Sequence, residues 1–129
     1  MAGRLLLDSN AVIAFLANDA ELRFKIVDAD EVFISTTVLG ELYYGAAKSS
    51  RVEENIAVVD RFARTCSVLV CTGRTAHTYG HLKAALKDKG KPIPENDLWI
   101  AAVAVENDLT LMTRDVHFES IDGLKFTSW

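Results

Sequence analysis

Four carboxylates in the sequence occupy positions that solubility alone does not explain: Asp8, Glu41, Asp97 and Asp115. Carboxylate oxygens are the ligands that hard cations such as Mg²⁺ and Mn²⁺ prefer in proteins. Four such groups in one place would repel one another and raise their own pKa values unless a cation lay between them. One or two divalent ions held there could bind a phosphodiester, lower the pKa of a water molecule for in-line attack and stabilise the leaving oxygen. The chemistry that these residues favour is therefore hydrolysis of a phosphodiester, without a covalent intermediate on the protein.

The elements that must position these acids are predicted from the apolar pattern. Short apolar runs predict strands, and apolar residues at spacings of three and four predict helices. Strands are expected at 4–8, 32–35, 67–71, 109–113 and 124–127. Helices are expected at 11–17, 21–30, 37–47, 51–65, 74–89 and 96–107. This alternation predicts an α/β fold, a three-layer α/β/α sandwich with a mostly parallel central sheet.

Two of the acids are expected at one edge of that sheet. Asp8 closes the first predicted strand, and Asp115 follows the fourth predicted strand closely. In sheets of this kind, ligands bind at the carboxyl ends of the strands. Taken alone, Asp8 could be an ordinary loop acid and Asp115 an ordinary turn residue, so it is their shared edge that favours a site.

Glu41 lies inside the predicted helix 37–47, at the border of the apolar stripe that contains Val38 and Leu42. Its neighbour one turn further along is Gly45 rather than a lysine, so the position is not suited to a surface ion pair. An acid at the edge of an apolar stripe, without a basic partner, is a candidate metal ligand.

Asp97 lies in the first turn of the predicted helix 96–107, where the positive end of the helix dipole stabilises an ionised carboxylate. Ala101 and Ala104 share its face, and such small residues would let this end of the helix pack close to the sheet. An N-terminal helix acid is common without any function, so Asp97 gains its meaning from the other three acids.

The composition sets wider limits. Half of the 129 residues are hydrophobic and a quarter are charged, which is typical of one globular domain, expected to span residues 1–129. The net charge of −4 argues against a protein that holds nucleic acid on a general basic surface. It does not argue against a nuclease, because clustered carboxylates are what a metal-dependent nuclease needs.

The apolar amino-terminal segment is interrupted by Asp8 and Asn10, so it is predicted to be folded protein rather than a signal peptide. No apolar stretch approaches the length needed to cross a bilayer, and a cytoplasmic location is expected. Cys66 and Cys71 match no metal-ligand spacing and are predicted to be free, mostly buried thiols.

Five segments, in this order along the chain, resemble the PIN-domain nucleases, and within them the VapC-type toxins of bacterial and archaeal toxin–antitoxin pairs. The segments are LLDSNAVIA at 6–14, ISTTVLGEL at 34–42, PIPENDLWIAA at 92–102, LMTRDVHF at 111–118, and LKF at 124–126 with the tryptophan at 129. Each motif alone is weak, but together they cover essentially the whole chain.

The resemblance implies an α/β/α fold, dependence on Mg²⁺ or Mn²⁺, endonucleolytic cleavage of RNA, a homodimer, and a cognate antitoxin protein that holds the toxin inactive. Carried over by position, Asp8, Glu41 and Asp97 look like the core metal ligands, and Asp115 looks like a fourth, more variable acidic position. The residues that would support these acids by hydrogen bonding are Ser9, Asn10 and Thr113. Asn10 departs from the Thr or Ser that many relatives carry there.

Other functions remain open at this stage. The chain could be a PIN-type RNA-processing nuclease outside a toxin–antitoxin pair, or a mainly non-catalytic dimeric co-repressor that acts with a DNA-binding antitoxin. A haloacid-dehalogenase-type phosphatase would need a second acid where Asn10 stands. A receiver-type phosphoacceptor would need an acidic pair near the first strand, which the sequence lacks.

Basic and aromatic residues near the acids complete the candidates. Lys87, Lys89 and Lys91, which follow Lys83 toward the loop before Asp97, together with Arg114, are possible contacts for RNA phosphates. The alternative for the lysines is a solvated helix face. His77 and His81 have the spacing of a zinc-binding pair, but Thr78 replaces the glutamate of a zinc protease, so an exposed pair without a ligand is expected. For His117 and Trp99, packing or an interface is predicted rather than catalysis.

Overall fold

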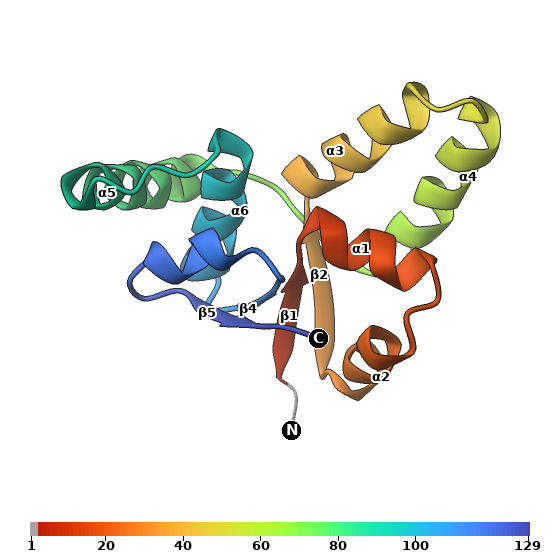
Figure 1. Cartoon of the computed structure of the whole chain (residues 1–129), viewed down its shortest axis with the longest axis horizontal. Coiled ribbons are helices and arrows are strands. Elements are labelled where there is room, and N and C mark those ends of the chain that lie inside the picture. The colour runs from red at the N-terminus through yellow and green to blue at the C-terminus, as the bar shows by residue number, and fades with distance from the viewer. Residues whose placement is uncertain (1–2) are drawn as a thin grey trace.

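The computed structural model describes residues 3–129, which alternate between strands and helices (Figure 1). The strands are β1 (Arg4–Leu7), β2 (Glu31–Ser35), β3 (Ser67–Leu69), β4 (Thr110–Met112) and β5 (Lys125–Thr127). The α-helices are α1 (Ser9–Leu16), α2 (Ala20–Asp28), α3 (Thr36–Ala47), α4 (Val52–Ala63), α5 (Gly73–Lys89) and α6 (Glu95–Glu106). A 3₁₀-helix, η1 (Val116–Ser120), joins β4 to β5 and was not predicted from the sequence.

All five strands form one sheet in the order β3-β2-β1-β4-β5, and every neighbouring pair is parallel. The predicted α/β/α sandwich is confirmed, and the sheet is entirely parallel where a mostly parallel one was expected. Figure 1 shows α5 and α6 on one side of β1 and β2, and α1 to α4 on the other. From β1 the strand order runs to β2 and β3 on one side and to β4 and β5 on the other, so the order reverses at β1. This is the switch point at which such sheets bind ligands.

Burial on both faces explains the composition of the central strand. Leu6 and Leu7 of β1 are completely inaccessible to solvent, as is Ile34 of β2. A strand covered by helices on both faces must be apolar at consecutive positions, which is why β1 reads as an unbroken leucine run. The first acid after this run, Asp8, therefore marks the point where the chain leaves the core.

Gly90 explains where the longest helix ends. It follows α5 with φ of 69°, in the left-handed region, and its N–H donates to the carbonyl groups of the last turn. Glycine adopts this conformation without the steric cost of a Cβ atom, so the predicted end of the helix is confirmed. The other predicted boundaries agree with the structure to within two residues.

The two cysteines are free thiols, as predicted. Cys66 is half-buried, and burial raises the pKa of its thiol. The expectation of mostly buried thiols is wrong for Cys71, which is exposed. The reason is that β3 ends at Leu69, so Cys71 lies beyond this edge strand instead of inside it.

The amino-terminal segment from Arg4 onward folds into β1 and α1, in agreement with its interpretation as folded protein. Met1 and Ala2 lie outside the described residues. Within residues 3–129, no helix combines the length and the apolar character that a membrane span requires.

We expect Leu6→Ala to lower the free energy of unfolding by about 3 kcal/mol, because it leaves a cavity in the completely buried centre of β1. Urea denaturation followed by circular dichroism measures this change. Val27→Ala, on an exposed face of α2 where the side chain is 83% accessible, is the control and should change stability by less than about 0.5 kcal/mol. Equal effects of the two substitutions would contradict the assignment of β1 as the core strand.

Candidate active site

Asp8 connects the end of β1 to the start of α1. Its carboxylate accepts a hydrogen bond from the Ala11 N–H at 2.8 Å, which caps the first turn of the helix, and the residue is only 4% exposed. Burial raises the pKa of Asp8, whereas hydrogen bonds from Thr113 and Ala11 to the carboxylate lower it, and the charges of Asp115 and Asp97 raise it. Asp8 is thus held rigidly in a place where its negative charge is costly without a cation.

Asp97 and Asp115 meet beside the same strand ends. Asp97 lies in the first turn of α6, and Asp115 lies between β4 and η1. One donor atom from each of them, with one from His117, all fall within 4.8 Å of one another. Burial raises the pKa of Asp97, the neighbouring His117 lowers it, and the charges of Asp115 and Glu41 raise it.

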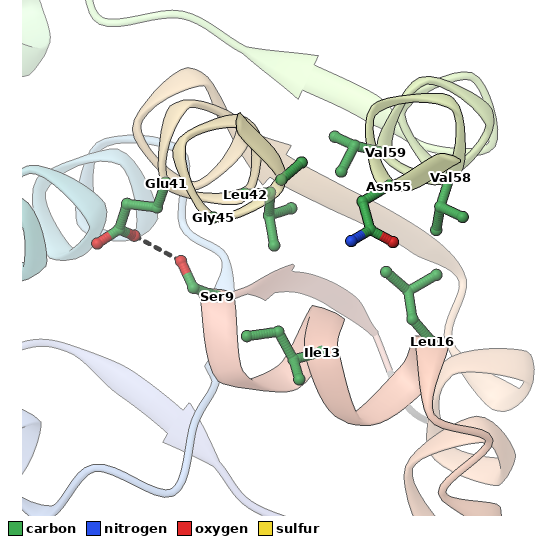
Figure 2. A pocket seen from close by; sticks show the side chains of 10 residues that line it. Ser9, Ile13, Leu16, Glu41, Leu42, Gly45, Asn55, Val58 and Val59 are labelled. Carbon is green, nitrogen blue, oxygen red and sulfur yellow. Dashed lines mark hydrogen bonds between the residues drawn. The ribbon is translucent and has the colours of Figure 1, made fainter. Parts of the chain in front are cut away.

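Glu41 reaches the site from α3 and is held by two polar contacts. The Ser9 hydroxyl donates to its Oε1 at 2.5 Å, and the Asn96 amide donates to its Oε2 at 3.4 Å. Figure 2 shows Ser9, at the start of α1, pointing across to Glu41 on α3. No lysine or arginine lies within ion-pair distance of Glu41 among residues 3–129, in agreement with its expected lack of a basic partner. The four acids therefore come from four separate segments of the chain, and Asp97 is within electrostatic reach of the other three.

The residues expected to support the acids differ in what they contact. Thr113 is 2% exposed, and its hydroxyl accepts a hydrogen bond from the Asp115 N–H at 3.0 Å in addition to its bond with Asp8. Ser9 positions Glu41, as described above. Asn10 is exposed, and within the described part of the chain its side chain makes no hydrogen bond. Thr113 therefore links two of the acids, while Asn10 is not part of this network.

We expect Ser9→Ala to reduce activity about tenfold, because Glu41 loses the contact that fixes its carboxylate. The free energy of unfolding should change by less than about 1.5 kcal/mol, since one partly exposed hydrogen bond is lost. Initial rates of substrate cleavage and thermal melting measure the two effects. Ser67→Ala, at an exposed position on β3, is the matched control. A full rate in the Ser9 variant would show that this contact does not matter for catalysis.

Sequence reasoning missed two residues at this site. His117 was assigned to packing or an interface, but its Nε2 lies 2.8 Å from Oδ2 of Asp97. Asn96 was not singled out, although it contacts Glu41. Their only signal in the sequence is that each lies within two residues of a predicted acid, in the segments 95–97 and 115–117. The prediction for Trp99 is confirmed, since its ring stacks on that of Tyr79 at 4.0 Å.

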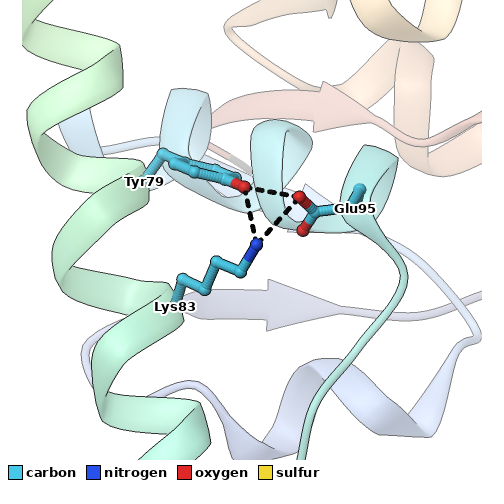
Figure 3. Close-up of polar contacts among 3 residues, drawn as sticks. All are labelled: Tyr79, Lys83 and Glu95. Carbon is cyan, nitrogen blue, oxygen red and sulfur yellow. Dashed lines mark hydrogen bonds and ion pairs between the residues drawn. The ribbon is translucent and has the colours of Figure 1, made fainter.

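The basic residues are less available than expected. Lys83 donates hydrogen bonds to Glu95 at 3.0 Å and to the Tyr79 hydroxyl (Figure 3). Both bonds raise the pKa of the lysine, and the one to Glu95 has the larger effect. Lys89 forms an ion pair with Asp122 at 3.0 Å. These two lysines therefore have intramolecular partners, which favours the solvated-face alternative for them.

Of the other three basic candidates, Arg114 has an intramolecular partner, whereas the two lysines have none among the described residues. Arg114 donates to the Trp129 carbonyl at 2.8 Å and stacks over its ring. Lys87 and Lys91 are exposed, and within residues 3–129 neither ammonium group has an acidic partner. Their contact with RNA stays a prediction, and Lys87 and Lys91 are the lysines best placed to test it.

His77 and His81 are exposed neighbours on α5, with ring centroids 4.6 Å apart. Neither belongs to the cluster of three potential ligands at Asp97. The acidic cluster is therefore separate from this histidine pair.

The fold and the carboxylates define a class of protein that comparison with known proteins identifies. Residues 5–124 match the PIN domain, so the chain belongs to the PIN-domain family, and the resemblance seen in the sequence is confirmed. The chain is 35% identical to ribonuclease VapC2 of Haemophilus influenzae, with 98% of each chain covered. It is 34% identical to the tRNA(fMet)-specific endonuclease VapC of Salmonella typhimurium, again with 98% of each covered.

Solved structures agree with this assignment. A chain of the DNA-bound VapBC from Salmonella typhimurium has a TM-score of 0.92 and 32% identity, with 98% of both chains covered. A chain of VapBC2 from Rickettsia felis, bound to a DNA fragment from its promoter, has a TM-score of 0.87 and 28% identity, with 98% of both covered. The fold is thus similar over the full described length to those of proteins from VapBC complexes.

Proposed function

We propose that this chain is a divalent-metal-dependent endoribonuclease and the toxin of a toxin–antitoxin pair, with a single domain that spans residues 1–129. The observation that carries the proposal is the convergence of the four acids named above, which lie after the carboxyl ends of β1 and β4, in the second turn of α3 and in the first turn of α6. Relatives that cover nearly the whole chain are named as ribonucleases and as a tRNA-specific endonuclease, which supports RNA as the substrate.

The donor set fits a divalent cation. Asp8 and Asp97 are buried enough for their pKa values to be raised, and each is also repelled by other carboxylates of the cluster. Within the described residues, no lysine or arginine forms an ion pair with any of the four acids. A cation is the simplest compensation for this charge, and oxygen donors suit Mg²⁺ or Mn²⁺. We propose Asp8, Glu41, Asp97 and Asp115 as the residues that hold it.

When bound, the ion supplies acidification of water and stabilisation of negative charge on a phosphate. The contribution of this chain is to hold the acids in place before the substrate arrives. Asp8 is fixed by its helix cap, Glu41 by Ser9 and Asn96, and the backbone of Asp115 by Thr113. Fixed donors cost no reorganisation during the reaction, which is the main source of electrostatic catalysis.

An antitoxin protein is the proposed partner, and a homodimer is the proposed state of the toxin itself. Solved neighbours are VapBC complexes, which supports the first proposal. A groove of about 260 Å³ between α1, α3 and α4 runs from Leu16 and Val58 to Ser9 and Glu41 (Figure 2). An apolar segment of an antitoxin would fit the apolar part of this groove and come close to the acids.

A second role is supported by the two VapBC neighbours described above, both of which are bound to DNA in their structures. In such a role the chain would contribute to repression as part of a DNA-bound complex with its antitoxin. The two roles do not exclude each other, because only the nuclease requires the acids. A variant without activity that still joins a DNA-bound complex would separate them.

The test of the proposed function is cleavage of RNA by the purified chain without its antitoxin. We expect total RNA, and transfer RNA in particular, to be cut in the presence of Mn²⁺ or Mg²⁺ and to stay intact with excess EDTA. Readdition of the ion after EDTA is the control for irreversible damage. If the folded protein leaves every RNA fraction intact with either ion, the nuclease proposal is wrong and the co-repressor role remains.

A further inference from the structure

His117 faces the acidic cluster in a manner that packing does not explain. The residue lies in η1, and its side chain is 31% exposed, yet its Nε2 atom is buried and lies 2.8 Å from Oδ2 of Asp97. The Asp97 carboxylate is the only acidic group within ion-pair distance of this atom among residues 3–129, and although His117 lowers the pKa of Asp97, the contact is too poorly aligned to satisfy the geometry of a hydrogen bond. A buried imidazole nitrogen whose single polar contact is poorly aligned is open to a further partner in the cluster.

The arrangement of the neighbouring oxygens indicates what that partner is. Donor atoms of Asp97, Asp115 and His117 all lie within 4.8 Å of one another. In a six-coordinate ion with bonds of about 2.1 Å, adjacent donors lie about 3 Å apart and opposite donors about 4.2 Å apart. The close but misaligned approach of the nitrogen to the carboxylate is what two donors directed at a common cation would show. Two atoms that bond directly to each other would instead be aligned.

We propose that His117 is a nitrogen ligand of the catalytic metal ion and makes the site select Mn²⁺ over Mg²⁺. The proposal rests on the metal site of the proposed function and adds to it a ligand that the four-carboxylate model does not contain. Mg²⁺ takes oxygen ligands almost exclusively, whereas imidazole is a good ligand for first-row transition ions. Addition of one imidazole to the set of carboxylates therefore favours the transition ion.

The competing role for His117 is that of a positioning residue, which would donate a hydrogen bond to Asp97 and never touch the ion. Both roles predict weaker activity when His117 is replaced, so activity cannot distinguish them. A direct bond between nitrogen and Mn²⁺ can, because the unpaired electrons of Mn²⁺ couple measurably to a coordinated nitrogen nucleus and only negligibly to one outside the coordination shell.

The experiment is pulsed electron paramagnetic resonance of Mn²⁺ bound to the purified chain. The sequence contains three histidines, so a His77→Ala/His81→Ala double variant leaves His117 as the only imidazole. We expect this double variant to keep the nitrogen coupling, to show a ¹⁵N pattern when grown with ¹⁵N-histidine, and to lose both when His117→Gln is added. This design assigns the coupling before His117 itself is changed, so the result does not depend on the folding of the His117 variant.

Binding constants give a second measurement. By calorimetry we expect the wild type to bind Mn²⁺ at least about tenfold more tightly than Mg²⁺, and His117→Gln to lose about tenfold in Mn²⁺ affinity while its Mg²⁺ affinity changes less than about twofold. Asp97→Asn should lose both ions.

The outcomes distinguish a failure of the His117 proposal from a failure of the proposed metal-dependent nuclease. Bound Mn²⁺ without nitrogen coupling in the double variant would overturn the role of His117 and leave the metal-dependent nuclease intact. Nitrogen coupling that persists after His117→Gln would likewise overturn the role of His117 and leave the nuclease proposal intact. If the wild type binds neither ion, both proposals fail.

Discussion

Asp97→Asn is expected to lower the rate of RNA cleavage by about 10³-fold while the chain remains folded. Asparagine keeps the size of the side chain but removes the charge of the residue that meets Asp115, His117 and Glu41. Without that charge the cluster loses the carboxylate that interacts with all three of these residues. Single-turnover cleavage of RNA at saturating Mn²⁺ measures the loss.

The melting temperature of the Asp97→Asn variant should show how much the negative charge of Asp97 destabilises the metal-free protein. Burial raises the pKa of Asp97 despite the opposing effect of His117, and the nearby carboxylates raise it further, so the charge of this residue costs stability in the metal-free protein. We expect Asp97→Asn without metal to melt at the same or a higher temperature than the wild type. With Mn²⁺ the order should reverse, because only the wild type gains stability from the bound ion. Asp88→Asn, exposed on α5, is the matched control. A variant that retains more than a tenth of the activity would remove Asp97 from the set of metal ligands.

Asp8 permits a sharper comparison, because it acts both as a helix cap and as a proposed ligand. We expect Asp8→Asn and Asp8→Ala both to lose about 10³-fold in activity, since each removes the carboxylate. They should differ in stability by about 1 kcal/mol, because asparagine can still accept the hydrogen bond from the Ala11 N–H and alanine cannot. Chemical denaturation of both variants measures the difference. Equal stability would mean that the cap contributes nothing.

The pH dependence of stability follows from the same residue. The pKa of Asp8 in the folded protein is raised above the ordinary value of 3.8, so the folded state binds this proton more tightly than the unfolded state does. The resulting stabilisation is fully present below pH 3.8 and is lost as the pH rises through the folded-state pKa. In metal-free protein, Asp8→Asn should therefore flatten the part of the profile above pH 3.8 in which wild-type stability falls. An unchanged profile would show that Asp8 does not titrate differently in the folded chain.

Local pattern was sufficient to predict most of the fold and the position of each acid along the chain. The short leucine run of β1 is typical of a strand covered on both faces, and Gly90 ends α5 because of its left-handed backbone. Because all strands are parallel, an acid after β1 and an acid after β4 must lie at one edge of the sheet. The convergence of Asp8 and Asp115 thus follows from topology.

Contacts across the site could not be predicted in this way. The segment that carries His117 is a short 3₁₀-helix, which has no apolar periodicity to detect. The contact between Asn96 and Glu41 depends on how closely α6 approaches α3, and that distance is set by packing rather than by either helix alone. The partners of Lys83 and Lys89 were hidden for the same reason, since Glu95 and Asp122 are remote in sequence.

The position of β1 in the middle of the sheet has a consequence during synthesis on the ribosome. Its pairing with β4 joins Leu5 to Thr110, and Asp115 and His117 follow only after that strand. A growing chain therefore carries Asp8 and Glu41 long before it can complete the cluster. The acidic cluster can therefore assemble only after β4 and the segment that follows it have been synthesised.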